Sequence, residues 1–303
     1  MTRNLSYLLG IIITILIGTY FYFTCCSDCR LATTDNEQAH EEIIPVTEPQ
    51  PTSFPFSVKD GEYAFEVNDN FNFDLSSKSI LMPISENVSN GVQSLKSYLL
   101  ENTNKVIEIT GLYRNDEDNP SAFPNLGLAR ANSVKNYLVS NGIPSAQTNT
   151  FGKLMDELLP MNNKLLGPIT YLISAGNENT ADDLKVLHDE IVASPLVLYF
   201  ETGEAAIYLT AEQRQKVANI STYLDKVSGA ACNVVGHTDN TGNRATNIGL
   251  GQERADFVKA YLVRNGIIAD KINATSHGPD SPIATNATEE GRSKNRRTVV
   301  TLN

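Results

Sequence analysis

Residues 250–267 read LGQERADFVKAYLVRNGI, and residues 126–143 read LGLARANSVKNYLVSNGI. The two stretches align without a gap, and 12 of the 18 positions are identical. Each stretch follows an apolar strand that ends in glycine, at Gly111 before the first and at Gly236 before the second. Self-similarity at a fixed spacing marks an internal repeat. Because the spacing is 124 residues (250 minus 126), the repeated unit has the size of a whole domain, and we expect two domains of one kind.

Alternating strands and helices are predicted in the second copy, residues 190–303. Apolar runs predict the strands, and amphipathic runs bounded by capping residues predict the helices. In chain order the elements are a strand at 196–200, a helix at 210–227, a strand at 231–235, a helix at 247–265, a strand at 272–276, a short helix at 288–296 and a strand at 298–302. Such an order packs helices on one face of a mixed sheet. The predicted fold class is therefore α/β, an α+β sandwich with two βαβαβ-type domains.

The chain begins with a segment that predicts a transmembrane helix. Residues 5–24 read LSYLLGIIITILIGTYFYFT, without Asp, Glu, Lys or Arg, and a helix needs about 20 apolar residues to cross a bilayer. A cleaved signal peptide is the alternative, but neither a small-x-small cleavage site nor a good lipoprotein box precedes Cys25. Arg3 and the N-terminal amine outweigh Arg30, which predicts that residues 1–4 are a cytoplasmic stub. We expect a single-pass protein of the cell envelope, anchored in the inner membrane, with both domains in the periplasm.

Two further segments lack the composition of a folded domain. Residues 25–60 contain four prolines and several glutamates, and they predict an acidic tether. Residues 177–189 predict a shorter linker between a first domain at 61–176 and the second at 190–303. Three cysteines lie at the start of the tether, where an interchain disulfide, lipidation and chance are all open explanations: Cys25, Cys26 and Cys29.

The charge balance excludes one class of partner. The chain has 24 Lys plus Arg and 35 Asp plus Glu, for a formal net charge of -11. A nucleic-acid backbone is held by a basic surface, so we expect no nucleic-acid partner. The spacing of His, Cys and carboxylate residues matches no metal site, and no cofactor motif is present, so neither a metal nor a cofactor is expected.

A charged residue lies on the apolar face of the predicted helix at 247–265. Leu250, Arg254 and Tyr261 recur at the spacing of one helical face. A guanidinium held against a core cannot shed its charge, so it needs an anionic partner or an outlet to water. A structural ion pair within the domain, or a long side chain that reaches solvent from a boundary position, would each meet this need.

The segment before this helix presents polar side chains at a strand end. Residues 236–243 read GHTDNTGN and follow the strand at 231–235 directly. Loops on a rigid scaffold are where ligand-binding residues concentrate, and we expect Asp239 to face the start of the helix that carries Arg254. A loop rich in Asp, Asn and Gly also has a purely structural interpretation as a turn.

These residues together resemble the OmpA-like C-terminal domain family. The pattern comprises residues 236–242 (GHTDNTG), Asn247, Leu250, Arg254, Ala255, Gly278, Pro282, Asn286, 290–292 (EGR) and 295–297 (NRR). The agreement covers about residues 190–303 in both residue type and spacing. In that family an Asp after the second strand and an Arg on the following helix grip the diaminopimelate of the peptidoglycan stem peptide. By position these residues are Asp239 and Arg254.

The resemblance also implies roles for neighbouring residues. Thr238, Asn247 and Leu250 would line or support the pocket, and Asn295 and Arg297 would help to fix it. Diaminopimelate in the stem offers an ammonium and a carboxylate on one carbon, so one ligand could satisfy both the Asp and the Arg. For two other cations a role in the last loop and a solvated charge run are both open: Arg292 and Arg296.

The first copy, residues 61–176, departs from the family pattern. Arg130 matches Arg254, but the place of Asp239 falls on a basic or amide residue, either Arg114 or Asn115. Two nearby acids could replace the missing carboxylate: Asp116 and Asp118. We expect Arg130 to be a relic or to form an internal ion pair. The first domain is then a degenerate copy that serves as a structural or protein-contact module, through which the chain forms a homo-oligomer or meets a partner in an envelope complex.

The function predicted from these features is a tether between a membrane, entered through residues 5–24, and peptidoglycan. The alternative is a stator of the MotB type or a scaffold subunit of a larger envelope complex that uses the wall only as an anchor. A stator needs an ionisable carboxylate within its membrane span, which residues 5–24 lack. A cell-wall hydrolase built on His237, Asp239 and Ser276 lacks a nucleophile elbow and a zinc-protease motif, so we expect no enzyme.

Overall fold

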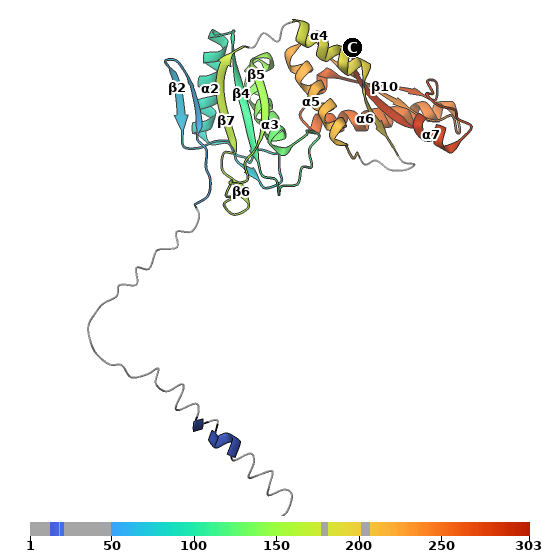
Figure 1. The fold of residues 1–303 in the computed structure, drawn as a ribbon. Helices are drawn as coiled ribbons and strands as arrows, with labels where there is room; N and C mark the ends of the chain where they lie inside the picture. Colours follow the sequence, from blue (N-terminus) through green and yellow to red (C-terminus); the bar gives the residue numbers. More distant parts are fainter. Residues whose placement is uncertain (1–12, 18, 21–49, 177–180, 201–206) are drawn as a thin grey trace, which may run out of the picture. The chain divides into compact units, whose positions relative to one another are not determined.

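The computed structural model describes residues 13–17, 19–20, 50–176, 181–200 and 207–303 (Figure 1). The chain separates into two compact units, Met1–Glu48 and Pro49–Asn303. Most of the predicted membrane span, and the cysteines at 25, 26 and 29, lie outside the described residues. Within the described ranges, every helix is too short or too polar to cross a bilayer. The second unit contains two modules, which we name the N-terminal module (residues 50–176) and the C-terminal module (residues 181–303).

The N-terminal module is built on a three-stranded sheet with the order β5-β4-β7. Its central strand β4 (Lys105–Tyr113) pairs in parallel with β5 (Thr148–Leu154) and antiparallel with β7 (Ile169–Ala175). Helices α2 (Glu86–Glu101) and α3 (Leu126–Ser140) pack against one face, because their apolar residues share one core with Ile107 and Ile109 of β4. A hairpin of β1 (Phe56–Asp60) and β2 (Tyr63–Val67) and a small sheet of β3 (Phe73–Asp74) and β6 (Lys164–Leu165) complete the module.

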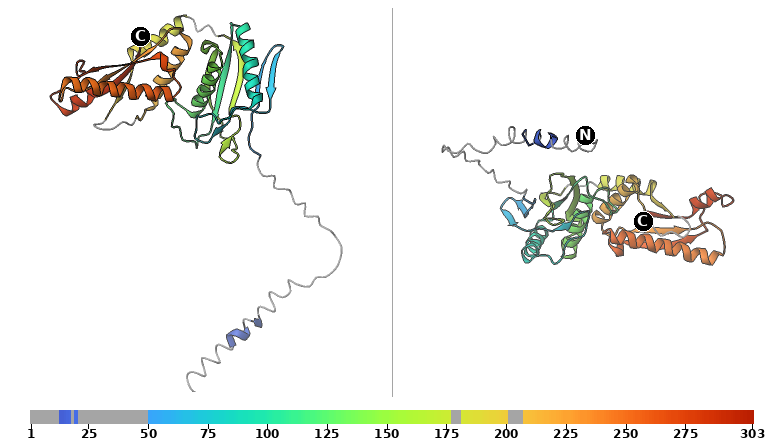
Figure 2. Two further views of the ribbon diagram at one scale, coloured as in Figure 1. Left: turned by 180° about the vertical axis from the view of Figure 1, so that it is seen from behind. Right: turned by 90° about the horizontal axis from the view of Figure 1, so that it is seen from below.

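The C-terminal module is built on a four-stranded sheet with the order β10-β9-β11-β8. The strands are β8 (Leu196–Tyr199), β9 (Cys232–His237), β10 (Ile272–Gly278) and β11 (Arg297–Leu302). The helices are α4 (Ala181–Ala193), α5 (Ala211–Lys226), α6 (Arg244–Arg264) and α7 (Glu289–Asn295), and α6 runs along the sheet (Figure 2). Apolar residues of α5 and α6 share one core with Val234 of β9 and Val300 of β11.

The two modules repeat one arrangement of elements. In each, a central strand runs parallel to the strand that follows the long helix and antiparallel to the last strand. A Cβ atom on Gly111 or on Gly236 would collide with the carbonyl oxygen of Gly127 or Gly251, respectively, on that helix. Only glycine permits this close approach between strand and helix. The predicted fold class, α/β with helices on a mixed sheet, is confirmed.

The structure differs from the expected organisation in two places. Helix α4 covers most of the segment 177–189 that was expected to be a linker, and β1 lies within the expected tether at 25–60. The apolar residues of each of these two elements pack into the core of the adjacent module. Ile191 joins the core of the C-terminal module, and Phe56 joins that of the N-terminal module. Composition alone does not reveal such contacts.

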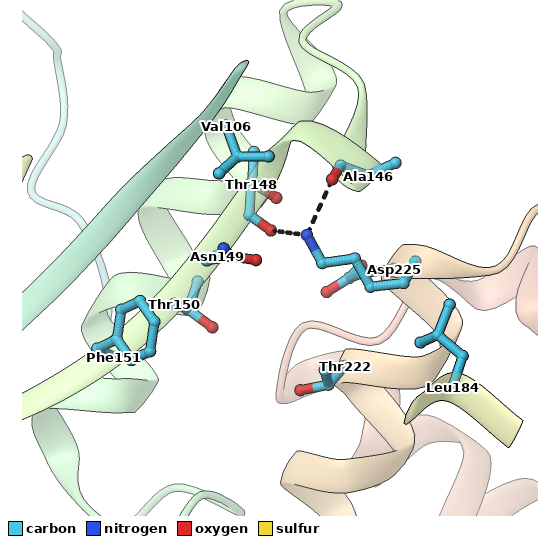
Figure 3. A pocket seen from close by; sticks show the side chains of 10 residues that line it. Val106, Ala146, Thr148, Asn149, Thr150, Phe151, Leu184, Thr222 and Asp225 are labelled. Carbon is cyan, nitrogen blue, oxygen red and sulfur yellow. Dashed lines mark hydrogen bonds between the residues drawn. The ribbon is translucent and has the colours of Figure 1, made fainter. Parts of the chain in front are cut away.

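Polar groups join the modules along one side of β5. Lys226 at the end of α5 donates hydrogen bonds from Nζ to the carbonyl oxygens of Ala146 and Thr148, at 2.8 Å each (Figure 3). Beside it, Lys135 of α3 forms an ion pair with Asp225 at 2.5 Å, with side chains that are 3% and 15% exposed. A pocket of about 470 Å³ lies between β5 and the helices α4 and α5. The amine of Lys226 thus covers backbone carbonyls on the edge of the N-terminal sheet.

Candidate ligand-binding site

The end of β9 and the start of α6 place the first site residues. Thr238 follows β9 and donates its N–H to the carbonyl of Gly278 at 2.9 Å. Gly242 has φ +89°, a left-handed conformation that favours glycine. Asn243 then caps α6 by accepting the N–H of Ala245 at 2.8 Å. These contacts fix the loop that carries the site side chains.

One pocket of about 590 Å³ lies beside this loop. It is lined by residues of the loop, of α6 and of the segment around α7: Thr238, Asp239, Thr241, Asn247, Leu250, Arg254, Glu289, Arg292 and Arg296. Of the seven residues predicted from the sequence, five line it, and these include Asp239 and Arg254. The two predicted charges therefore lie in one hollow, together with four residues that the sequence analysis did not select.

Asp239 is nearly buried and already holds two hydrogen bonds. Its Oδ1 accepts the N–H of Thr241 at 2.9 Å, and its Oδ2 accepts Nη1 of Arg296 at 3.0 Å. Burial alone would raise the pKa of the Asp239 carboxyl, but the Thr241 N–H and the Arg296 guanidinium outweigh burial and lower it. Asp239 is thus held as an anion in a fixed orientation.

Arg254 is positioned by the backbone and by an aromatic ring. Its Nη1 donates to the carbonyl of His237 at 3.0 Å, and its Cζ lies 5.9 Å from the centre of the Phe200 ring. Burial lowers the pKa of Arg254, and the nearby Arg296 lowers it further, while Asp239 raises it. No carboxylate forms an ion pair with Arg254 in the part of the chain that the structure describes. Its guanidinium therefore presents charge to the pocket.

The wall around α7 contains two arginines whose role the sequence left open, Arg292 and Arg296, and one acid that the sequence did not single out, Glu289. Arg296 pairs with Asp239 through Nη1 and with Glu289 through Nη2 at 2.7 Å, and Arg292 donates from Nε to Glu289 at 2.9 Å. The sequence signal was the run of Asn, Arg and Arg at 295–297, at the start of β11. Of the two arginines in this run, Arg296 is the C-cap residue of α7 and Arg297 begins β11, and only one of them lines the pocket. Arg296 is the one that does.

The last two predicted residues brace a loop outside the pocket. Asn295 is fully buried, and its Oδ1 accepts the N–H groups of Ile283 at 2.8 Å and Ala284 at 3.1 Å. Arg297 donates from Nη2 to the carbonyl of Ser281 at 3.1 Å. Both residues thus fix the segment that precedes α7, and neither of them lines the pocket.

Among the described residues, four buried side-chain atoms have no hydrogen-bond partner: His237 Nδ1, Thr238 Oγ1, Arg296 Nε and Thr298 Oγ1. Two of these residues, Thr238 and Arg296, line the pocket. Burial, together with Arg297 and His277, lowers the pKa of His237 to about 4, so the ring is neutral at pH 7. No group of three or more His, Cys, Asp or Glu side chains suited to a metal ion occurs in the described ranges.

Arg130 of the N-terminal module, which corresponds to Arg254, has no access to solvent. Arg130 is completely buried and forms an ion pair with Glu117, whose side chain is 2% exposed. The expected internal ion pair is thus present, but its acid is neither Asp116 nor Asp118. Asp116 instead pairs with Arg114 at 2.6 Å. Glu117 lies between these two acids, and the sequence analysis named only the Asp on either side of it.

Part of the chain is similar in sequence to several known proteins. The chain is 40% identical over 86 residues to the probable lipoprotein YiaD of Escherichia coli (strain K12), covering 28% of this chain and 39% of that protein. It is 46% identical over 121 residues to the peptidoglycan-binding protein ArfA of Mycobacterium tuberculosis, covering 40% and 36%. It is 39% identical over 92 residues to the peptidoglycan-associated lipoprotein of Haemophilus influenzae, covering 30% and 60%.

The chain therefore spans less than two thirds of the length of each of these relatives. A family model described as the OmpA family matches residues 199–296. The matched range contains Asp239, Arg254 and Arg296, and hence the charged residues of the pocket. Residues 199–296 of this chain form a domain of the OmpA family.

Proposed function

We propose that the C-terminal module binds peptidoglycan non-covalently, by gripping the diaminopimelate of a stem peptide between Asp239 and Arg254. The observation that carries this proposal is that the Arg254 guanidinium, which has no carboxylate partner among the described residues, lines the same pocket as a fixed, nearly buried carboxylate. Two relatives of the domain carry names that refer to peptidoglycan. A ligand with an ammonium and a carboxylate on one carbon matches these two charges.

The pocket supplies a partner for each group of such a ligand. Arg254 offers parallel N–H donors to the carboxylate, an arrangement that is stronger and more specific than a single contact. Asp239 keeps lone pairs for the ammonium beside its hydrogen bonds to Thr241 and Arg296. Leu250, which is 39% exposed, provides an apolar wall for the methylene chain. A side chain of lysine has the ammonium but lacks this carboxylate, so lysine-type stems should bind less well.

The module acts as an anchor within the envelope in this proposal. Residues 5–24 hold the chain in the inner membrane, and residues 25–49 extend into the periplasm. The pocket of the C-terminal module binds the peptidoglycan. One small zwitterion buries little surface, so the affinity of a single module should be modest. Several assembled copies would raise the apparent affinity through avidity. The N-terminal module, a degenerate duplicate in this proposal, provides contacts for a further copy or for another subunit.

The test is sedimentation of the purified full-length chain with cell-wall sacculi that contain diaminopimelate. The Arg254→Met variant should stay in the supernatant while the unchanged chain sediments with the wall. Arg244→Met is the matched control, because Arg244 lies on the same helix, is 69% exposed and pairs with Asp280 outside the pocket. Circular dichroism confirms that both variants are folded. Retention of Arg254→Met at the level of Arg244→Met would refute the proposed grip.

A further inference from the structure

Arg130 and Arg254 are held by the same backbone contact. Arg130 Nη1 donates to the carbonyl of Leu112 at 2.9 Å, and Arg254 Nη1 donates to the carbonyl of His237 at 3.0 Å. Leu112 and His237 each follow the glycine at which strand and helix approach most closely. The two guanidinium groups therefore contact corresponding backbone carbonyls of the two sheets.

An aromatic ring covers each guanidinium in the same way. Cζ of Arg130 lies 5.6 Å from the ring centre of Phe73, and Cζ of Arg254 lies 5.9 Å from that of Phe200. Phe73 belongs to the short strand β3, and Phe200 directly follows β8. Contact with an aromatic face favours a cation. Backbone carbonyl, arginine and ring thus form one recurring construction in both modules.

The two modules differ in the group that accepts hydrogen bonds from the remaining N–H groups of the arginine. Both carboxylate oxygens of Glu117 accept from Arg130, Oε2 from Nη1 at 3.0 Å and Oε1 from Nη2. Nε donates to the carbonyl of Ser77 at 3.0 Å. Arg254 has no such carboxylate among the described residues, and it opens to the pocket. The N–H groups of Arg130 thus donate to acceptors of the chain itself, chiefly the carboxylate of Glu117.

The loop that brings Glu117 to Arg130 replaces the start of a helix. Helix α6 begins at Arg244, which corresponds to position 120 at the repeat spacing of 124 residues, whereas α3 begins only at Leu126. Pro120 and Pro124 occupy the intervening segment, and proline lacks the N–H that a helix interior requires. The backbone therefore continues as a loop over residues 114–125, and Glu117 lies in this loop.

Glu117 is fixed there by two backbone donors besides Arg130. Its Oε2 accepts the N–H of Arg114 at 2.9 Å, and its Oε1 accepts the N–H of Ser76 at 2.9 Å. Burial alone would raise the pKa of Glu117, but the Arg130 guanidinium and these N–H groups outweigh burial and lower it. A carboxylate with this many donors is bound as an ion, as a ligand carboxylate would be.

We infer that the N-terminal module retains a carboxylate-binding pocket around Arg130, and that Glu117 occupies it as an intramolecular ligand. Removal of the Glu117 side chain would leave a buried, uncompensated guanidinium next to free backbone donors. Such a site takes a small monocarboxylate such as acetate or formate. The inference concerns the N-terminal module, and its test does not depend on whether the C-terminal pocket binds the wall.

The experiment measures thermal unfolding of the full-length chain in sodium acetate and in sodium chloride of equal ionic strength. Glu117→Ala should have a lower Tm than the unchanged chain in chloride, and acetate should restore part of the loss with a saturating dose dependence. Glu117→Gln keeps the pocket filled, so acetate should have no more effect on it than on the unchanged chain. The double variant Glu117→Ala/Arg130→Met lacks the cation and should not respond.

Asp116→Ala is the matched control, because it removes a carboxylate from the same loop that is 67% exposed and pairs with Arg114. If Glu117→Ala does not fold in chloride, the yield of folded protein after refolding in acetate replaces Tm as the measured quantity. Recovery in acetate, absent from the double variant, supports the inference. Equal Tm or equal yield of Glu117→Ala in acetate and chloride would overturn it.

Discussion

Arg296 holds Asp239 by a hydrogen bond of 3.0 Å from Nη1 to Oδ2, with both side chains close to buried at 12% and 13% exposure. The same guanidinium reaches Glu289 with its other nitrogen at 2.7 Å. Arg296 thus joins the loop after β9 to helix α7 across the pocket. It keeps the carboxylate of Asp239 ionised and oriented, so its effect on a ligand is exerted through Asp239.

Replacement of Arg296 should change the pH dependence of wall binding. Because Arg296 helps to lower the pKa of Asp239, Arg296→Met should raise that pKa toward its ordinary value or above it. Protonated Asp239 cannot hold an ammonium, so the acidic limit of sacculus binding should move to higher pH. Sedimentation between pH 3 and pH 7 measures the shift. Lys294→Met, on the exposed side of α7, is the control and should leave the profile unchanged.

His237 should make the C-terminal module less stable in mild acid. Burial lowers its pKa from 6.5 to about 4 in the fold, so the unfolded chain binds a proton between these values and the folded chain does not. The free energy of unfolding therefore falls as the pH drops from about 6.5 toward 4. His237→Phe should show a smaller decrease over this range in urea titrations. An identical decrease in both proteins would exclude His237 as its source.

Two glycines of the C-terminal module, Gly236 and Gly249, give opposite predictions for replacement by alanine. A Cβ at Gly236 would collide with the backbone of Gly251, so Gly236→Ala should destabilise the chain by about 1–3 kcal/mol. Gly249 lies within α6 with nothing near its Cβ position. Gly249→Ala should therefore stabilise by up to about 1 kcal/mol, because alanine has the higher helix propensity. Denaturant unfolding distinguishes the two, and equal effects would contradict the close packing of β9 on α6.

Lys226 should give a stability change in mild base. Burial lowers its pKa from 10.5 to about 8, so between these values the unfolded chain holds a proton that the folded chain has released. The free energy of unfolding contributed by this group therefore rises as the pH increases from about 8 to 10.5. The difference between the unchanged chain and Lys226→Met, measured in urea at pH 7.5 and at pH 9.5, should grow with pH. A constant difference would show that Lys226 is not desolvated at the contact with β5 in Figure 3.

The sequence singled out two of the charged residues that line the pocket, but it left the role of the surrounding arginines open. Asp239 and Arg254 were selected by the resemblance to the OmpA-like family, after the strand end and the helical period had indicated that they lie near each other. Arg296 was ambiguous, since its neighbour Arg297 has the same charge, and only the structure shows that Arg296, at the C-cap of α7, lines the pocket while Arg297 begins β11. Glu117 was unpredictable because a loop with two prolines has no period from which a direction follows. Helix α4 was missed because its packing against the C-terminal core depends on tertiary contacts.

If Arg254 and Asp239 together hold one zwitterion, the chain should distinguish two stem peptides. Isothermal titration of the full-length chain with a diaminopimelate-containing muropeptide, and with its lysine-containing counterpart, measures this difference. We expect saturable binding of the first, at least about tenfold weaker binding of the second, which corresponds to about 1.4 kcal/mol, and no measurable binding to Arg254→Met. Equal affinity for both muropeptides, or unchanged affinity of Arg254→Met, would contradict this expectation.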